Sequence, residues 1–156
     1  MHKHKTGAWI RASVKLGLLA SGSEDDDLDQ RLERYATCIG LAFQVQDDIL
    51  GIWGDENVTG KSAASDLVEG KNSLPILFGI GKKSKFSNRW SEGPLRAEEV
   101  AEFAAELERE GARSFAEHTA REQTDKALMF LEEANSGGEA GAALLELANK
   151  LLGRAN

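Results

Sequence analysis

The stretch "ATCIGLAFQVQDDILGI", residues 36–52, has the pattern of a helix that is buried over most of its surface. An advance of about 100° per residue, as in an α-helix, gathers its polar and small residues in a single sector roughly a third of a turn wide. That sector holds Thr37, Gly40, Gln44, Asp47, Asp48 and Gly51. Apolar residues fill most of the remaining surface, with Gln46 as the exception. A surface helix shows the reverse pattern, so this stretch predicts a core helix with one narrow polar strip.

Two adjacent carboxylates, Asp47 and Asp48, stand on that strip. Burying a carboxylate without a partner is costly, and neighbouring acids also repel each other. A divalent cation or facing lysines would offset both effects, and Gly40 and Gly51 would leave room for a ligand beside the acids. The alternative is that the strip faces water at the rim of a helix bundle. The residues alone favour neither interpretation over the other.

The rest of the chain also has a helical pattern, and no strand alternation accompanies it. We expect helices over 6–20, 28–52, 97–110, 112–134 and 139–155, with a short buried helix at 73–80 that carries Pro75 in its first turn. Residues 55–73 are expected to form a loop or a helix broken by a loop, and residues 81–94 a surface connection. The acids at 25–27 fit the cap and first turn of the second helix. The fold class is therefore predicted to be all-α.

Composition limits the possible functions. The chain has 156 residues, of which 41% are hydrophobic and 29% charged, as in a soluble globular protein with one domain. The net charge of −7 argues against general nucleic-acid binding, and Cys38, the single cysteine, rules out an internal disulfide and a cysteine-based zinc site. No apolar run is long enough for a transmembrane segment, and no secretory signal is evident, so the expected location is cytoplasmic.

The segment "GDENVTGKS", residues 54–62, resembles a nucleotide-binding P-loop only superficially. A Walker A loop places four residues between its first glycine and Gly-Lys-Ser/Thr, and it joins a strand to a helix. Here five residues separate Gly54 from Gly60, and the preceding element is a long helix. A P-loop is therefore excluded. Lys61 could still bind phosphate as a point charge, or it could be a solvated loop lysine.

Two segments together resemble a known family. "GLAFQVQDDILGIWGDENVTGKSAASDLVEGKNSLPIL", residues 40–77, is similar to the C-terminal signature of the all-trans isoprenyl diphosphate synthases, or polyprenyl synthetases. "KTGA", residues 5–8, resembles the Lys-Thr element that this family carries on the preceding helix. The family includes farnesyl and geranylgeranyl diphosphate synthases. The resemblance implies the C-terminal part of an isoprenoid-synthase helical bundle, with residues 1–156 forming a partial synthase domain.

The resemblance also implies roles for particular residues. Asp47 and Asp48 match the first two acids of the second aspartate-rich motif, which bind Mg²⁺ bridging the allylic diphosphate. Lysines that reach the same diphosphate are matched by Lys5, Lys61 and Lys71; Thr6 and Gln44 match pocket-lining residues, and Phe43 forms a Phe-Gln pair with Gln44. Asp66 stands where the following loop carries a further acid of open role. The implied catalytic set is Lys5, Thr6, Gln44, Asp47, Asp48 and Lys61.

The implied activity is a prenyl transfer, in which isopentenyl diphosphate attacks the cation left when an allylic diphosphate ionises. Mg²⁺ and lysines stabilise the charge on the departing diphosphate, while apolar helix walls protect the cation from water. The released diphosphate can act as the base, so no catalytic histidine or serine is required. His2, His4 and His118 therefore need no role.

The chain departs from the family pattern in two ways. Gly51 stands where the motif usually has a third acid, although variants with glycine there occur among geranylgeranyl-type members. The family's chain is also about twice as long, and its first aspartate-rich motif has no counterpart here. We therefore expect one wall of a two-walled site, inactive alone, with apolar surface at Trp9 and Phe43 that a homo-oligomer or a complementary synthase chain would cover. The alternative is a non-catalytic truncated paralogue that binds and modulates a full-length synthase.

Overall fold

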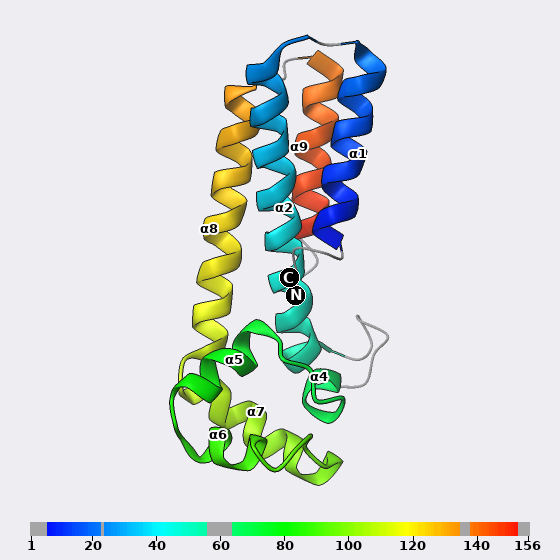
Figure 1. Ribbon diagram of the computed structural model, residues 1–156. Helices are drawn as coiled ribbons and strands as arrows, with labels where there is room; N and C mark the ends of the chain where they lie inside the picture. The colour runs from blue at the N-terminus through cyan, green and yellow to red at the C-terminus, as the bar shows by residue number, and fades with distance from the viewer. Residues whose placement is uncertain (1–5, 23, 56–63, 135–137, 153–156) are drawn as a thin grey trace. The chain divides into compact units, whose positions relative to one another are not determined.

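The computed structural model describes residues 6–22, 24–55, 64–134 and 138–152, and these form helices joined by turns, with no strand among them (Figure 1). The predicted all-α class is confirmed. The chain divides into two compact units, one comprising residues 1–44 and 119–154 and the other residues 45–118. Each unit is described by itself below. None of the described helices is both long enough and apolar enough to cross a membrane.

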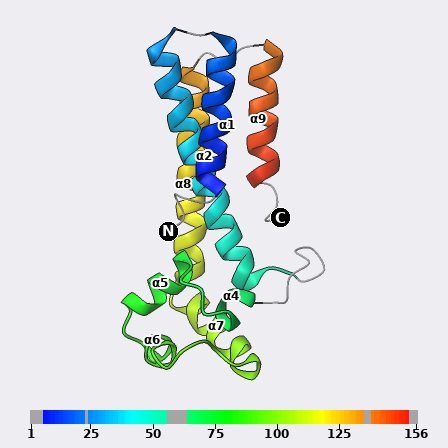
Figure 2. The ribbon, with the colours of Figure 1, turned by 45° about the vertical axis from the view of Figure 1, so that its right-hand side comes forward.

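The first unit is a bundle of helices that lie side by side in both views (Figures 1 and 2). It contains α1 (Thr6–Ser21), α9 (Gly138–Leu152) and, as far as residue 44 and from residue 119, parts of α2 (Asp26–Trp53) and α8 (Ala112–Glu133). These bounds confirm the predicted helices to within a few residues. The Asp25 carboxylate accepts the backbone N–H groups of Asp27 and Leu28, each at 3.0 Å, so the acids before α2 do cap it as expected.

The core of this bundle joins α2, α8 and α9 through Tyr35, Ile39, Ala127, Leu131 and Ala148. At Gly40, a β-carbon would lie only 2.7 Å from the Cα atom of Gly7, so the two glycines let α1 and α2 pack backbone to backbone. The space at Gly40 is therefore filled by a neighbouring helix. The expectation that this glycine leaves room for a ligand was wrong.

The second unit contains the end of α2, the start of α8 and a series of short elements between them. These are α4 (Ser65–Val68), α5 (Leu74–Gly81), α6 (Lys85–Trp90), the 3₁₀ turn η2 (Ala97–Glu99) and α7 (Val100–Arg109). Part of the predicted loop, residues 56–63, lies outside the described residues. Pro75 lies in the first turn of α5, as predicted. Gly111, at φ +87°, ends the α7 segment before α8 begins, which also agrees with the prediction.

Residues 81–94 are more than the predicted surface connection, because they contain α6. The ring of Phe86 is fully buried and stacks on Trp90 with ring centroids 5.5 Å apart. Phe86 also belongs to the core cluster that includes Phe103 and Leu107 of α7. The spacing of four residues places the rings of Phe86 and Trp90 on one face of α6. Burial of Phe86 against the core stabilises this short helix.

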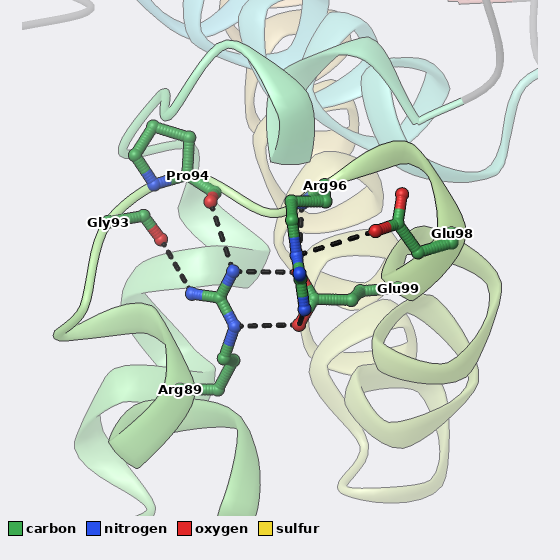
Figure 3. A network of polar contacts seen from close by, with 6 residues as sticks. All are labelled: Arg89, Gly93, Pro94, Arg96, Glu98 and Glu99. Atoms are coloured by element: carbon green, nitrogen blue, oxygen red, sulfur yellow. Dashed lines mark hydrogen bonds and ion pairs between the residues drawn. The ribbon is translucent and has the colours of Figure 1, made fainter.

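A hydrogen-bonded network holds the turn between α6 and α7 (Figure 3). The Arg89 guanidinium donates to the Glu99 carboxylate from Nε at 2.9 Å and from Nη2 at 2.7 Å, and it also reaches the carbonyls of Gly93 and Pro94. Arg96 donates to the same carboxylate. These bonds, that of Arg89 first, lower the pKa of Glu99 far below its usual range.

Candidate functional site

The two acids of α2 lie in different environments although they are adjacent in sequence. Asp47 is exposed, whereas the Asp48 residue is only 4% exposed. The structure describes all of residues 36–52, and apart from Asp47 each of them is buried or half-buried. The predicted core helix is thus confirmed, and its surface opens to solvent at Asp47.

The Asp48 carboxylate is bound to the start of α5. Its Oδ2 atom accepts the backbone N–H of Leu74, the first residue of α5, at 2.8 Å. The first N–H groups of a helix have no partner within the helix, and an N-cap serine commonly binds one of them. Ser73 is the N-cap here, yet its buried hydroxyl makes no such bond. Asp48 therefore caps α5 from a distance.

Asp66, the second residue of α4, lies against the backbone of Gly51. A β-carbon built on Gly51 would be 2.6 Å from the carboxyl carbon of Asp66, and Asp66 is only 6% exposed. The space at position 51 is therefore filled by a carboxylate that comes from α4. The expectation that Gly51 leaves room for a ligand was wrong, because this side chain takes the room.

Lys71 binds the carboxylate that fills this space. Its Nζ atom lies 3.0 Å from Oδ1 of Asp66 and 2.8 Å from Oε2 of Glu69. Hydrogen bonds to Glu69 and then to Asp66 raise the pKa of Lys71 to about 12, so its amine stays charged at neutral pH. The Lys71 side chain remains about half exposed, at 48%.

The structure places some of the other predicted site residues. Phe43 and Gln44 are half-buried on α2. Lys5 and Lys61 lie outside the described residues, and for Thr6 only the backbone, at the start of α1, is described. The sequence pattern does not predict that Asp66 and Glu69 are the carboxylate partners of Lys71. The separations of Asp66 and Glu69 from Lys71, five and two residues, match no single helical or strand repeat. The turn after α4 brings the three side chains together.

A family model for polyprenyl synthetases matches residues 1–107 of the chain. The chain belongs to the polyprenyl synthetase family. Farnesyl diphosphate synthase of Escherichia coli is 47% identical over 85 residues, a match that covers 54% of this chain and 28% of that enzyme.

Solved polyprenyl synthetases also share the fold. A polyprenyl synthetase from Streptomyces coelicolor superposes with a TM-score of 0.82 at 30% identity, covering 97% of this chain and 48% of that one. A geranylgeranyl pyrophosphate synthase of Corynebacterium glutamicum, solved with isoprenyl diphosphate and magnesium, gives a TM-score of 0.72 at 28% identity, covering 83% of this chain and 38% of that one. This chain thus spans about half the length of the Streptomyces polyprenyl synthetase.

The donor set fits the Mg²⁺ that the resemblance to polyprenyl synthetases implies. Among the described residues, no group of three or more His, Cys, Asp or Glu side chains is arranged to hold a metal ion by itself. Mg²⁺ prefers oxygen ligands and is usually held by one or two carboxylates together with substrate phosphates. An exposed carboxylate at Asp47, with the ammonium group of Lys71 elsewhere in the same unit, fits that mode of binding.

Proposed function

We propose that this chain forms one wall of the active site of a prenyltransferase that joins an allylic diphosphate to isopentenyl diphosphate. The single observation that carries the proposal is Asp47, the exposed acid in the otherwise buried or half-buried stretch 36–52 of a polyprenyl synthetase chain. The magnesium and isoprenyl diphosphate in the Corynebacterium glutamicum relative support the same ligands here.

In this mechanism the C–O bond of the allylic diphosphate breaks, and its electron pair leaves with the diphosphate. Asp47 would hold Mg²⁺, which when bound neutralises part of the charge on the departing oxygens. Lys71 supplies a fixed positive charge to the same diphosphate, because Asp66 and Glu69 hold its amine in place and keep it protonated. The double bond of isopentenyl diphosphate attacks the cation, and the proton that is then lost passes to the released diphosphate.

Ile49 and Ile52 are buried on the same helix as the acids, and Ile52 packs in the core of the second unit, so these residues hold the helix that carries Asp47. In this proposal Lys5, Thr6, Phe43, Gln44 and Lys61 keep the diphosphate-binding roles that the resemblance implies for them. The other wall, with the first aspartate-rich motif, comes from residues that this chain does not contain, so the chain alone is expected not to elongate prenyl chains.

The test is a calorimetric titration of the 156-residue chain with inorganic pyrophosphate, with and without Mg²⁺. We expect binding that requires Mg²⁺ and that weakens by about tenfold or more in Asp47→Asn, because one metal ligand loses its charge. Asp125→Asn, a change at an exposed acid of α8, is the matched control and should bind as the wild type does. A folded wild-type chain that binds no pyrophosphate with Mg²⁺ present would contradict the proposal.

A further inference from the structure

We propose that Asp48 is a positioning residue that ties α5 to α2 and thereby helps to hold Lys71 beside that helix. This inference rests on the proposed function for the role of Asp47, but the role of Asp48 stands on its own geometry. Asp47 and Asp48, which the sequence alone assigns to the same metal, then have different roles.

The first step is the bond that Asp48 makes. Its Oδ2 atom lies 2.8 Å from the backbone nitrogen of Leu74, and the residue is 4% exposed. Ser73, which is in the position to cap α5, is 2% exposed and its Oγ atom has no hydrogen-bond partner in the part of the chain that the structure describes. The start of α5 is therefore held by an acid 26 residues earlier in the chain.

The second step is what this bond fixes. Lys71 lies three residues before Leu74, and the segment between them is held to α2 at both ends. At one end the partner of Lys71, Asp66, lies against Gly51; at the other, Leu74 is bound to Asp48. Positions 48 and 51 are close to one turn apart on a helix, so both attachments are made to the same turn of α2. Asp48 thereby helps to hold the ammonium group of Lys71 beside α2.

The third step is the contrast with Asp47. Successive residues of a helix point about 100° apart, so one acid can face the protein while its neighbour faces solvent. Asp47 is exposed and accessible to a hydrated cation, which keeps several of its waters when it binds. Asp48 is buried and already accepts a backbone N–H. A carboxylate gives a stronger cap than a neutral group, but the cap itself needs only an acceptor oxygen.

Substitution by asparagine separates the two roles, because its side-chain oxygen can accept the same N–H without carrying a charge. We compare Asp48→Asn, Asp48→Ala and Asp47→Asn in the full chain, with Ser73→Ala as the control for changes at the α5 N-terminus. Two quantities are measured: hydrogen exchange at the Leu74 amide, and Mg²⁺-dependent binding of inorganic pyrophosphate by calorimetry. The exchange measurement requires no ligand and so does not depend on the proposed function.

We expect the Leu74 amide to exchange about tenfold or more faster in Asp48→Ala, and close to the wild-type rate in Asp48→Asn and Ser73→Ala. Pyrophosphate binding should weaken by about tenfold or more in Asp47→Asn and stay within about threefold of the wild type in Asp48→Asn. Unchanged exchange in Asp48→Ala would overturn the positioning role. Equal loss of binding in Asp48→Asn and Asp47→Asn, with the amide still protected, would show that Asp48 is a ligand. A wild type that binds no pyrophosphate would instead remove the proposed function and leave the exchange result to decide the role of Asp48.

Discussion

Gly51 stands where the resemblance places a third acid, and its lack of a side chain is what allows Asp66 to lie against α2. The carboxyl carbon of Asp66 would be 2.6 Å from a β-carbon at position 51, far inside van der Waals contact. A side chain at 51 and the observed position of Asp66 therefore exclude each other. Glycine in place of a third acid at position 51 therefore goes together with the burial of Asp66 against α2.

Gly51→Ala should destabilise the chain, by about 1–3 kcal/mol in the free energy of unfolding, because the added methyl group displaces Asp66 and its bond to Lys71. Urea unfolding measures the change. Gly17→Ala is the matched control, since a β-carbon at this helical position meets nothing within 4 Å. Alanine there should raise the stability by about 0.5–1 kcal/mol. A Gly51→Ala chain that gains stability as the control does would show that Asp66 moves freely.

The sequence indicates which residues share the strip on α2 but not which of the two acids is buried. Asp47 and Asp48 both fall within the same polar sector, so helical periodicity alone does not predict which of them is buried. The difference comes from α5, whose first N–H group meets Asp48. That contact joins residues 26 positions apart, and no local pattern predicts it.

At the scale of elements, the helices with several turns of apolar periodicity and the short α5 were predicted well, whereas α6 was not. The bounds of α1, α2 and α8 agree with the sequence pattern to within a few residues, because each has several turns of regular spacing. In contrast, α6 is six residues long and was expected to be part of a connection. It exists because Phe86 is buried against α7, and a tertiary contact of this kind overrides weak local preference.

The network at the end of α6 makes stability depend on pH. The pKa of Glu99 is lower in the folded chain than in the unfolded one, so the ionised carboxylate contributes stability that is fully present above its unfolded pKa, about 4.3. That contribution is lost as the pH falls from there through the folded value. Glu99→Gln should therefore lower the free energy of unfolding at pH 7, and its difference from the wild type should shrink progressively below about pH 4.3.

Urea unfolding of both chains over this pH range measures the effect. Glu98→Gln is the control, because Glu98 is an exposed neighbour that lies 3.5 Å from Arg96, at the outer limit of an ion pair. It should follow the wild type at every pH. A constant difference between Glu99→Gln and the wild type from neutral to acid pH would show that the ion pairs of Figure 3 do not depend on the charge of Glu99.

At the scale of the molecule, large apolar side chains of the first unit are exposed on α1. On α1, Trp9 is 78%, Leu16 66% and Leu19 69% exposed, and helical spacing places these three side chains within about a quarter of a turn. Beside them runs an apolar groove of about 800 Å³ lined by α1, α2 and α9. The prediction that Trp9 is left uncovered is confirmed, whereas Phe43 is half-buried. The match to 48% of the Streptomyces coelicolor relative suggests what would cover α1.

We expect this face of α1 to bind the half of a polyprenyl synthetase that the chain does not match. Co-expression of the chain with that half of the Streptomyces coelicolor relative should allow the two to be purified together, since burying large apolar side chains provides about 1.5–3 kcal/mol each. Trp9→Asp combined with Leu16→Asp should reduce the captured amount by about tenfold or more. Met129→Asp on α8, where Met129 is 44% exposed, is the control for an added charge on the first unit and should leave capture unchanged.

Native mass spectrometry tests the other possibility, that this face joins two copies of the chain. If the wild-type chain is a stable homodimer that captures nothing, and the double variant is a monomer, the face joins two copies of this chain and the expected partner is wrong.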